Sequence, residues 1–445
     1  MKKAVVAMLA VVLAGVLCIP FASGLIMEKT IRQAFTDVNA LYADTGAGYS
    51  LEIVDYQRGY LASDIEWKID LGALKNIYPI DEVIFKDTAK HGFAGVVSTT
   101  SLRENPWYEA FVAEKLGGRD PFHITTRYGL TGGIESTVAL DPFSVVVDNE
   151  TIDVQAGSMV TKTDRELKHF TSKGNWGGLS AGEAASIGKI SLASALTRFT
   201  TFIWNGDFSF AMRDVNLRKK DNSFEMKEMK GSYLLGLNED QSKMNGEALF
   251  SIDGMRTDGQ TINSASVHLA TNGLDVEGYE TFMQMYTRNM SQVLGSMAAM
   301  DENTEEVGEA MKKQMAAVGL QMIAAYEKLL KEGLEFKVSD LDVQLDDGQI
   351  KGDMTLRLLK DMTFMQFAPV VSQPELLFDI FYLKSNLSLP ARLVGENPKM
   401  VTPLYPGMQT GLFVKDGGNL VHAAETIDGK LIVNDQEVIL SPQNL

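Results

Sequence analysis

The chain is poor in cysteine: Cys18 is the only one in 445 residues. Because Cys18 lies within an apolar segment near the N-terminus, the rest of the chain has no thiol. That part can form no disulfide, no cysteine-ligated zinc or iron–sulfur site, and no thiolate nucleophile. A folded body does not need disulfides at this size, since about 400 residues can bury a sufficient apolar core.

Basic residues are also scarce. Lysine and arginine total 41 against 58 acidic residues, which gives a formal net charge of −17. Such a chain offers no basic stripe to neutralise phosphates, so the composition argues against nucleic acid as a partner. It also argues against docking of the whole body by charge on an anionic lipid surface. Any attachment to a membrane is therefore expected to come from an apolar segment.

One such segment is present near the N-terminus. Lys2 and Lys3 precede an apolar run from Ala4 to Met27. At about 1.5 Å per helical residue, this run is long enough to cross a hydrocarbon core of roughly 30 Å. The sequence predicts a membrane anchor within residues 1–27, with the two lysines in the cytoplasm and the remaining chain in the bacterial periplasm.

A cleaved signal peptide is the alternative interpretation of this segment. Pro20 is expected to break a helix, and Ala22-Ser23-Gly24 offers the small residues that a signal peptidase requires. Apolar residues nevertheless continue to Met27, beyond that site. The anchor is favoured, and the cleaved signal remains open.

Residues 28–275 are predicted to form a β-rich region that begins with a short amphipathic helix at 28–43. Within residues 61–69, apolar and polar side chains alternate with period two, which predicts one covered and one solvated sheet face. Dipeptides such as Asp253-Gly254 favour tight hairpin turns. The absence of strand–helix–strand alternation argues against a parallel sheet.

A helical pair is predicted at residues 276–333, because apolar residues from Met311 to Leu329 recur in steps of four and three. Methionines concentrate here. They suit a surface that receives variable acyl chains, but they also pack ordinary cores. The candidate apolar-ligand face consists of Met283, Met290, Met297, Met311, Met315 and Met322. Residues 334–445 return to strands.

A second candidate motif combines Arg58-Gly59, in the first hairpin, with His91-Gly92, after a later strand. Glycine at 59 permits positive φ, and the arginine is expected to reach a carboxylate or backbone carbonyls. An anionic headgroup is the alternative partner of Arg58. His91 is expected to satisfy a backbone carbonyl at a strand end.

Together with the helical pair and the terminal hairpin at residues 427–434, these motifs resemble the YdgA-like family of bacterial cell-envelope proteins, over most of the chain. The resemblance implies attachment to the inner membrane and a periplasmic body, with no established reaction and no catalytic residues. At the level of fold alone, the architecture is also similar to AsmA-like envelope proteins, whose long curved sheets form lipid-carrying grooves.

The sequence gives little support for catalysis. Gly178-Leu179-Ser180-Ala181-Gly182 matches a nucleophile elbow, which requires a buried strand before the serine and a helix after it. A polar, glycine-rich stretch precedes it instead. The five histidines show no close pairing of the kind found in metal sites, so no metal or cofactor is predicted.

The predicted fold is a β-rich α+β protein: an elongated, curved antiparallel sheet with an inserted helical pair and an N-terminal membrane-spanning helix. The predicted function is a non-enzymatic envelope protein that binds lipid or another apolar ligand in a sheet groove. The alternative is a periplasmic scaffold with a self-filled core and another envelope protein as its partner. A serine hydrolase ranks third.

Overall fold

The computed structural model describes residues 2–43, 49–72, 80–102, 105–147, 150–219, 222–257, 260–298, 319, 322–363, 365, 373–396 and 411–438. For some of these, including 2–18 and 290–298, it describes the backbone alone. The chain divides into two units. Unit 1 comprises residues 1–182, 191–204 and 284–318, and unit 2 comprises residues 183–190, 205–283 and 319–445.

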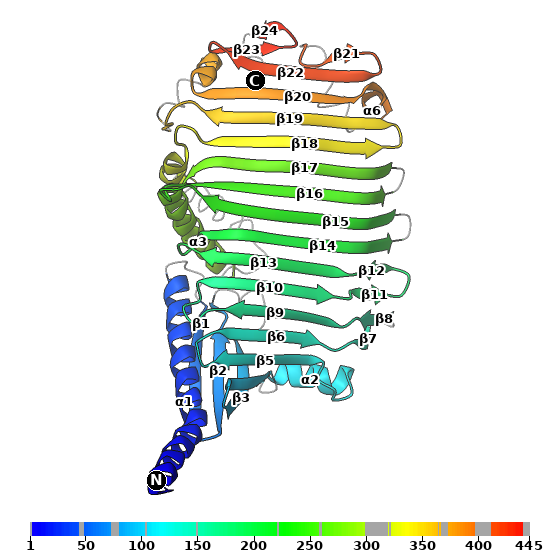
Figure 1. Ribbon diagram of the computed structural model, residues 1–445. Helices are drawn as coiled ribbons and strands as arrows, with labels where there is room; N and C mark the ends of the chain where they lie inside the picture. Colours follow the sequence, from blue (N-terminus) through cyan, green and yellow to red (C-terminus); the bar gives the residue numbers. More distant parts are fainter. Residues whose placement is uncertain are drawn as a thin grey trace. The chain divides into compact units, whose positions relative to one another are not determined.

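Both units are rich in β-strands and have few helices, and every described strand pair is antiparallel (Figure 1). The prediction of an antiparallel β-rich α+β protein is confirmed to that extent. The elongated and curved shape and the predicted domain boundaries stay predictions.

Unit 1 is a meander in the order β1-β2-β3-β4-β5-β6-β9-β10-β13, with the short strands β7, β8 and β11 paired beside it. Its elements are α1 (Lys2–Ala43), β1 (Ser50–Arg58), β2 (Ala62–Asp70), β3 (Glu82–Gly92), β4 (Gly95–Ser101), α2 (Pro106–Lys115), β5 (Phe122–Gly129), β6 (Ile134–Leu140), β7 (Phe143–Val147), β8 (Glu150–Val154), β9 (Gly157–Thr163), β10 (His169–Trp176), β11 (Leu179–Ala181) and β13 (Ile190–Arg198).

Helix α1 is continuous over 42 residues and contains Pro20. The expected break at Pro20 is therefore wrong, and the helix predicted at 28–43 is the second part of a longer one. Near the proline, the buried Ser23 hydroxyl donates a hydrogen bond of 2.8 Å to the Pro20 carbonyl.

The second part of α1 packs on the sheet of unit 1. The core consists of Met27 and Ile31 from α1 with Ile65, Ala89 and Val96 from β2, β3 and β4, each at most 5% exposed. Full burial of a valine, isoleucine or methionine side chain stabilises the fold by about 1.5–3 kcal/mol. The alternation predicted for residues 61–69 is confirmed, since the covered face of β2 is the one that α1 contacts.

A glycine permits a close approach of α1 to the sheet. A Cβ atom at Gly24 would lie 2.2 Å from Cε1 of the His91 ring, far inside normal contact distance. His91 is itself buried. The imidazole thus occupies the space that any larger residue at position 24 would need.

Unit 2 has the strand order β12-β14-β15-β16-β17-β18-β19-β20-β22, and the far edge of β22 is shared by β21 and β23, with β24 beyond β23. Its elements are β12 (Ala185–Ile187), β14 (Trp204–Lys219), β15 (Asn222–Leu237), β16 (Lys243–Thr257), β17 (Gln260–Asp275), the first residues of α3 (Val276–Ala298), β18 (Glu335–Leu345), β19 (Gly348–Leu358), η3 (Pro374–Asp379), β20 (Phe381–Pro390), α6 (Ala391–Glu396), β21 (Val414–Asp416), β22 (Asn419–Ile427), β23 (Lys430–Val433) and β24 (Gln436–Val438).

Helix α3 starts directly after β17, where the Asp275 carboxylate accepts a hydrogen bond of 2.8 Å from the Gly278 backbone N–H. This is the usual role of an N-cap residue. Residues 322–329 are also helical, and the Phe282 and Tyr326 rings lie 5.2 Å apart. The two helical segments predicted in this region are therefore present, while residues 299–318 lie outside the described part.

The local predictions agree with the structure only in part. Helix α2 was not predicted, because its sequence has no clear apolar face. The terminal hairpin is confirmed: Asp428 and Gly429 have φ of 50° and 75° and connect β22 to β23, as a two-residue turn with positive φ at both positions requires.

Within the described residues, no helix is long and apolar enough to cross a bilayer. The side chains of residues 2–18, which make up most of the predicted anchor, lie outside the described part.

The contact between Gly24 and His91 gives a testable prediction. Gly24→Ala should destabilise the protein by about 1–3 kcal/mol, because a buried methyl group is forced against the ring. In a His91→Ala background the same substitution should cost much less. Denaturant unfolding of the full chain measures both values. Gly319→Ala, in a helical position where a Cβ meets nothing within 4 Å, is the control and should be neutral or slightly stabilising. An equal cost of Gly24→Ala in both backgrounds would exclude this contact as the cause.

Candidate functional site

One face of the sheet in unit 2 is apolar across β14 to β19. Antiparallel register places residues that pair across strands on the same face, so the members can be followed from strand to strand. Figure 1 shows these strands side by side in chain order. We call this set the apolar face: Phe208, Phe210, Tyr233, Phe250, Leu269, Phe336 and Met354.

Much of the apolar face is accessible to solvent. Tyr233 is 42% exposed, Phe250 41% and Phe336 44%. Neighbouring residues in the same strands point to the opposite face, which carries ion pairs such as Arg213–Glu228 at 2.6 Å and two separate exposed leucines, Leu234 and Leu249. A contiguous set of exposed apolar side chains on one face of a sheet indicates a binding surface.

At two positions of the apolar face, a glycine leaves space for the aromatic ring of a neighbouring strand. A Cβ atom at Gly231 would lie 2.3 Å from the Phe210 ring, and one at Gly246 would lie 3.4 Å from the Tyr233 hydroxyl. The two aromatic rings therefore lie over neighbouring glycines and cover the backbone. Aromatic rings that lie flat over the backbone are better suited to contact with an apolar ligand than with a hydrogen-bonding one.

The predicted methionine face is only partly described. Met283 is half-buried and Met322 is 6% exposed. The side chains of Met290, Met297, Met311 and Met315 lie outside the described residues, so a methionine-lined ligand face stays a prediction.

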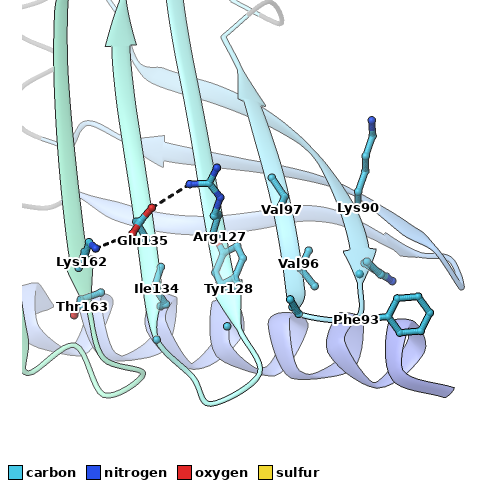
Figure 2. Close-up of a pocket in the computed structure, with 16 residues that line it drawn as sticks. Lys90, Phe93, Val96, Val97, Arg127, Tyr128, Ile134, Glu135, Lys162 and Thr163 are labelled. Carbon is cyan, nitrogen blue, oxygen red and sulfur yellow. Dashed lines mark hydrogen bonds and ion pairs between the residues drawn. The ribbon is translucent and has the colours of Figure 1, made fainter. Parts of the chain in front are cut away.

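A hollow of about 930 Å³ lies in unit 1 at the ends of β3, β4, β5, β6 and β9 (Figure 2). The turn between β3 and β4 contributes Phe93, which is 59% exposed, and β4 contributes Val97, which is 42% exposed. Across the strands, Lys90 pairs with Val97 and Val97 with Arg127. The same row continues through Glu135 to Lys162. We call this feature the rim hollow.

Glu135 holds two of the three cations of the rim hollow. Its carboxylate lies 3.0 Å from Arg127 and 3.0 Å from Lys162, as the dashed lines in Figure 2 show. Lys162 and Arg127 together keep the pKa of Glu135 below its ordinary value. Lys90 has no ion pair among the described residues. Three cations and one carboxylate leave a formal excess of two positive charges at the rim hollow.

The predicted motif of Arg58, Gly59, His91 and Gly92 lies beside α1. Arg58 reaches the Glu28 carboxylate of α1 at 2.7 Å, as expected for an arginine with a carboxylate partner. The expected positive φ at Gly59 is wrong, since Gly59 is absent from the glycines with positive φ. Glycine is needed there because a Cβ would lie 2.8 Å from the Ala62 carbonyl. Gly92 pairs with Gly95 at the tight end of the β3–β4 hairpin.

His91 satisfies a backbone carbonyl, as predicted. Its Nδ1 lies 3.2 Å from the Tyr60 carbonyl, and its Nε2 lies 2.8 Å from the Ser63 hydroxyl. A carbonyl can only accept, so Nδ1 carries a proton; in the neutral ring Nε2 then accepts from the Ser63 hydroxyl. The same pattern joins His422 to Ser385 at 2.9 Å and to the Leu412 carbonyl at 2.8 Å. These contacts give both histidines structural roles.

A buried carboxylate was not predicted from the sequence. Asp87 of β3 is 6% exposed, and burial raises the pKa of its carboxyl group. The Trp67 indole N–H donates to Oδ2 at 3.3 Å, and the Thr100 and Ser98 hydroxyls partly offset the effect of burial, although Oδ1 has no hydrogen bond of normal length among the described residues. The nearby Tyr56 is also affected: burial raises the pKa of its hydroxyl to about 12. The alternation of β3 could have indicated this position, since Asp87 shares a face with Ala89 and His91.

The nucleophile-elbow interpretation of Ser180 is not supported. Ser180 lies in β11, and a turn and strand β12 follow it instead of a helix. In the described part of the chain, no group of three or more His, Cys, Asp or Glu side chains could hold a metal ion.

These features describe a class of protein: a β-rich, antiparallel chain with a long N-terminal helix packed on its sheet and an exposed apolar sheet face. Comparison with known proteins agrees with the family suggested by the motifs. The profile of a bacterial family described as proteins of unknown function (DUF945) matches residues 1–441. The chain belongs to this family.

A curated relative is Protein YdgA of Escherichia coli strain K12. It is 21% identical to this chain over 436 residues, which cover 91% of this chain and 84% of the relative. The predicted YdgA-like resemblance is thereby confirmed. No solved structure matches the chain.

The buried carboxylate gives a prediction about pH. Since folding raises the pKa of Asp87, its contribution to stability is present below the unfolded-state pKa of about 3.9 and is lost as pH rises through the folded-state pKa. Asp87→Asn should therefore stabilise the protein at pH 7 by on the order of 1 kcal/mol, the typical cost of an unsatisfied buried polar group. The gain should shrink in acid. Denaturant unfolding across pH tests this, with the exposed Asp64→Asn as control. A gain that does not change with pH would contradict the assignment.

Proposed function

We propose that this protein is a non-enzymatic component of the bacterial cell envelope that binds lipid or another apolar ligand on the apolar face of unit 2. The main support for this proposal is the solvent exposure of aromatic and aliphatic side chains across the apolar face. A scaffold with a self-filled core would instead leave Tyr233, Phe250 and Phe336 covered. Exposing them to water is unfavourable by roughly 25 cal/mol per Å² of apolar surface, and a ligand with acyl chains would remove that cost.

We further propose that the N-terminal segment remains attached and holds the protein at the inner membrane, with the body in the periplasm. Residues at and after the small-residue site are part of the fold of unit 1. Ser23 and Met27 are buried, and Gly24 lies against His91. Cleavage near Gly24 would remove part of the α1 contact with the sheet.

The ligand site can be tested with a pair of adjacent residues. Phe250→Asp places a charge on the apolar face, whereas Leu249→Asp places one on the opposite face at a position that is 50% exposed. Phe250→Asp should weaken binding of a fluorescent fatty acid about tenfold, since losing one large apolar contact costs about 1.4 kcal/mol or more. Leu249→Asp should bind like the unmodified chain.

The same two variants should differ in mass spectra of lipid extracts from the purified full chain. Lipid that surrounds the N-terminal segment is common to both, so a difference reports on the apolar face. Equal lipid content and equal fatty-acid affinity in both variants would exclude this face as the ligand site.

The attachment can be tested on the mature protein. The full chain expressed in bacteria should remain in the membrane fraction after an alkaline wash, and peptide mass spectrometry should recover the N-terminal peptide that contains Lys2 and Lys3. Release of the chain by alkali, together with a new N-terminus near Leu25, would establish a cleaved signal instead.

A further inference from the structure

The rim hollow of unit 1 combines positive charge with apolar surface in a chain of net charge −17. Three of its lining side chains are cationic and one is acidic. The acidic group, Glu135, lies between Arg127 and Lys162 and contacts both. It therefore fixes these two cations without neutralising the hollow, and Lys90 remains without an ion pair among the described residues.

The apolar part of the hollow lies next to these cations. Val97 sits in the cross-strand row between Lys90 and Arg127. Phe93 projects from the β3–β4 turn, and Ile134 lines the hollow from β6. A ligand that contacted both parts would carry negative charge at one end and apolar groups at the other.

The hollow is also close to helix α1. His91 lines it from β3, and the ring of His91 lies against Gly24. Gly24 is close to the end of the apolar run that starts at Ala4. The cations lie on the other face of the sheet, because Lys90 and His91 are consecutive in β3 and their side chains point to opposite faces.

We propose that the rim hollow binds the headgroup phosphate of an anionic phospholipid, with Lys90, Arg127 and Lys162 as its cationic partners. The arginine and the lysines donate charge-assisted hydrogen bonds to phosphate oxygens, while Val97 and Phe93 contact the glycerol and the first methylene groups. The location near a bilayer rests on the proposed membrane attachment. The apolar face of unit 2 is not part of this site.

Charge complementarity is the argument for an anionic lipid over a zwitterionic one. A choline or ethanolamine group would place a cation close to the same three cations. Phosphatidylglycerol carries its phosphate without a compensating cation. The hollow is therefore expected to discriminate between headgroups, which an exposed apolar surface cannot do.

The test uses the full chain in a non-ionic detergent and isothermal titration calorimetry. The ligands are short-chain phosphatidylglycerol, short-chain phosphatidylcholine and inorganic phosphate. The unmodified chain should bind phosphatidylglycerol about tenfold more tightly than phosphatidylcholine, the size of effect expected from one charge-assisted hydrogen bond. Inorganic phosphate should bind more weakly than phosphatidylglycerol, since it lacks the apolar contacts.

Two variants locate the site. Lys90→Gln combined with Lys162→Gln should remove the preference for phosphatidylglycerol. Lys173→Gln, on the neighbouring strand β10 and outside the hollow, should retain it. Thermal unfolding of each variant checks that it is folded.

The outcomes separate this proposal from the proposed function. Equal affinity for both lipids, or an unchanged preference in the double variant, would overturn headgroup binding at the rim hollow. Inorganic phosphate that binds as tightly as phosphatidylglycerol would overturn the lipid assignment in favour of a free anion. Each of these three results would leave fatty-acid binding on the apolar face intact, because that measurement depends on Phe250 and not on the lysines.

Discussion

The contact between α1 and the sheet of unit 1 depends on a missing side chain. Gly24 leaves room for the buried ring of His91, and His91 in turn holds the Ser63 hydroxyl and the Tyr60 carbonyl. Around this point, Arg58 reaches Glu28 of the helix, and Met27 fills the core. Dense packing transmits any change at one such contact to its neighbours. The middle of helix α1 is thereby fixed on the sheet, and a change in one of the polar or apolar contacts around Gly24 is expected to affect the others.

Unit 2 meets a different constraint. An antiparallel sheet can bury one face and solvate the other, yet its apolar face leaves Phe250 and Phe336 more than two-fifths exposed. Long strands with an exposed apolar face also invite association. A bound apolar ligand would relieve both costs at once, and it would do so through contacts that tolerate many acyl-chain lengths. This reasoning favours a ligand surface over a scaffold, for which the exposure has no use.

Some of this could be predicted from the sequence. The alternation of residues 61–69 gave the covered face of β2, and Asp428-Gly429 gave the last hairpin. The partner of Arg58 was predicted only as a type, a carboxylate, because pattern analysis cannot choose among 58 acidic residues. The residues of the apolar face and of the rim hollow were not predicted, for a related reason. A one-residue change of register moves every side chain of a strand to the other face, and sequence alone does not fix the register of long strands.

The net charge of the whole chain does not describe the local charge of the rim hollow. A formal net charge of −17 opposes attraction of the whole body to an anionic surface. At physiological salt, however, interactions between exposed charges are screened over about 8 Å. A headgroup in contact with Lys90 and Arg127 would therefore respond mainly to the charges that line the hollow. The two statements concern different distances, so an acidic protein can repel anionic membranes at long range and still select an anionic headgroup once its own helix has brought it there.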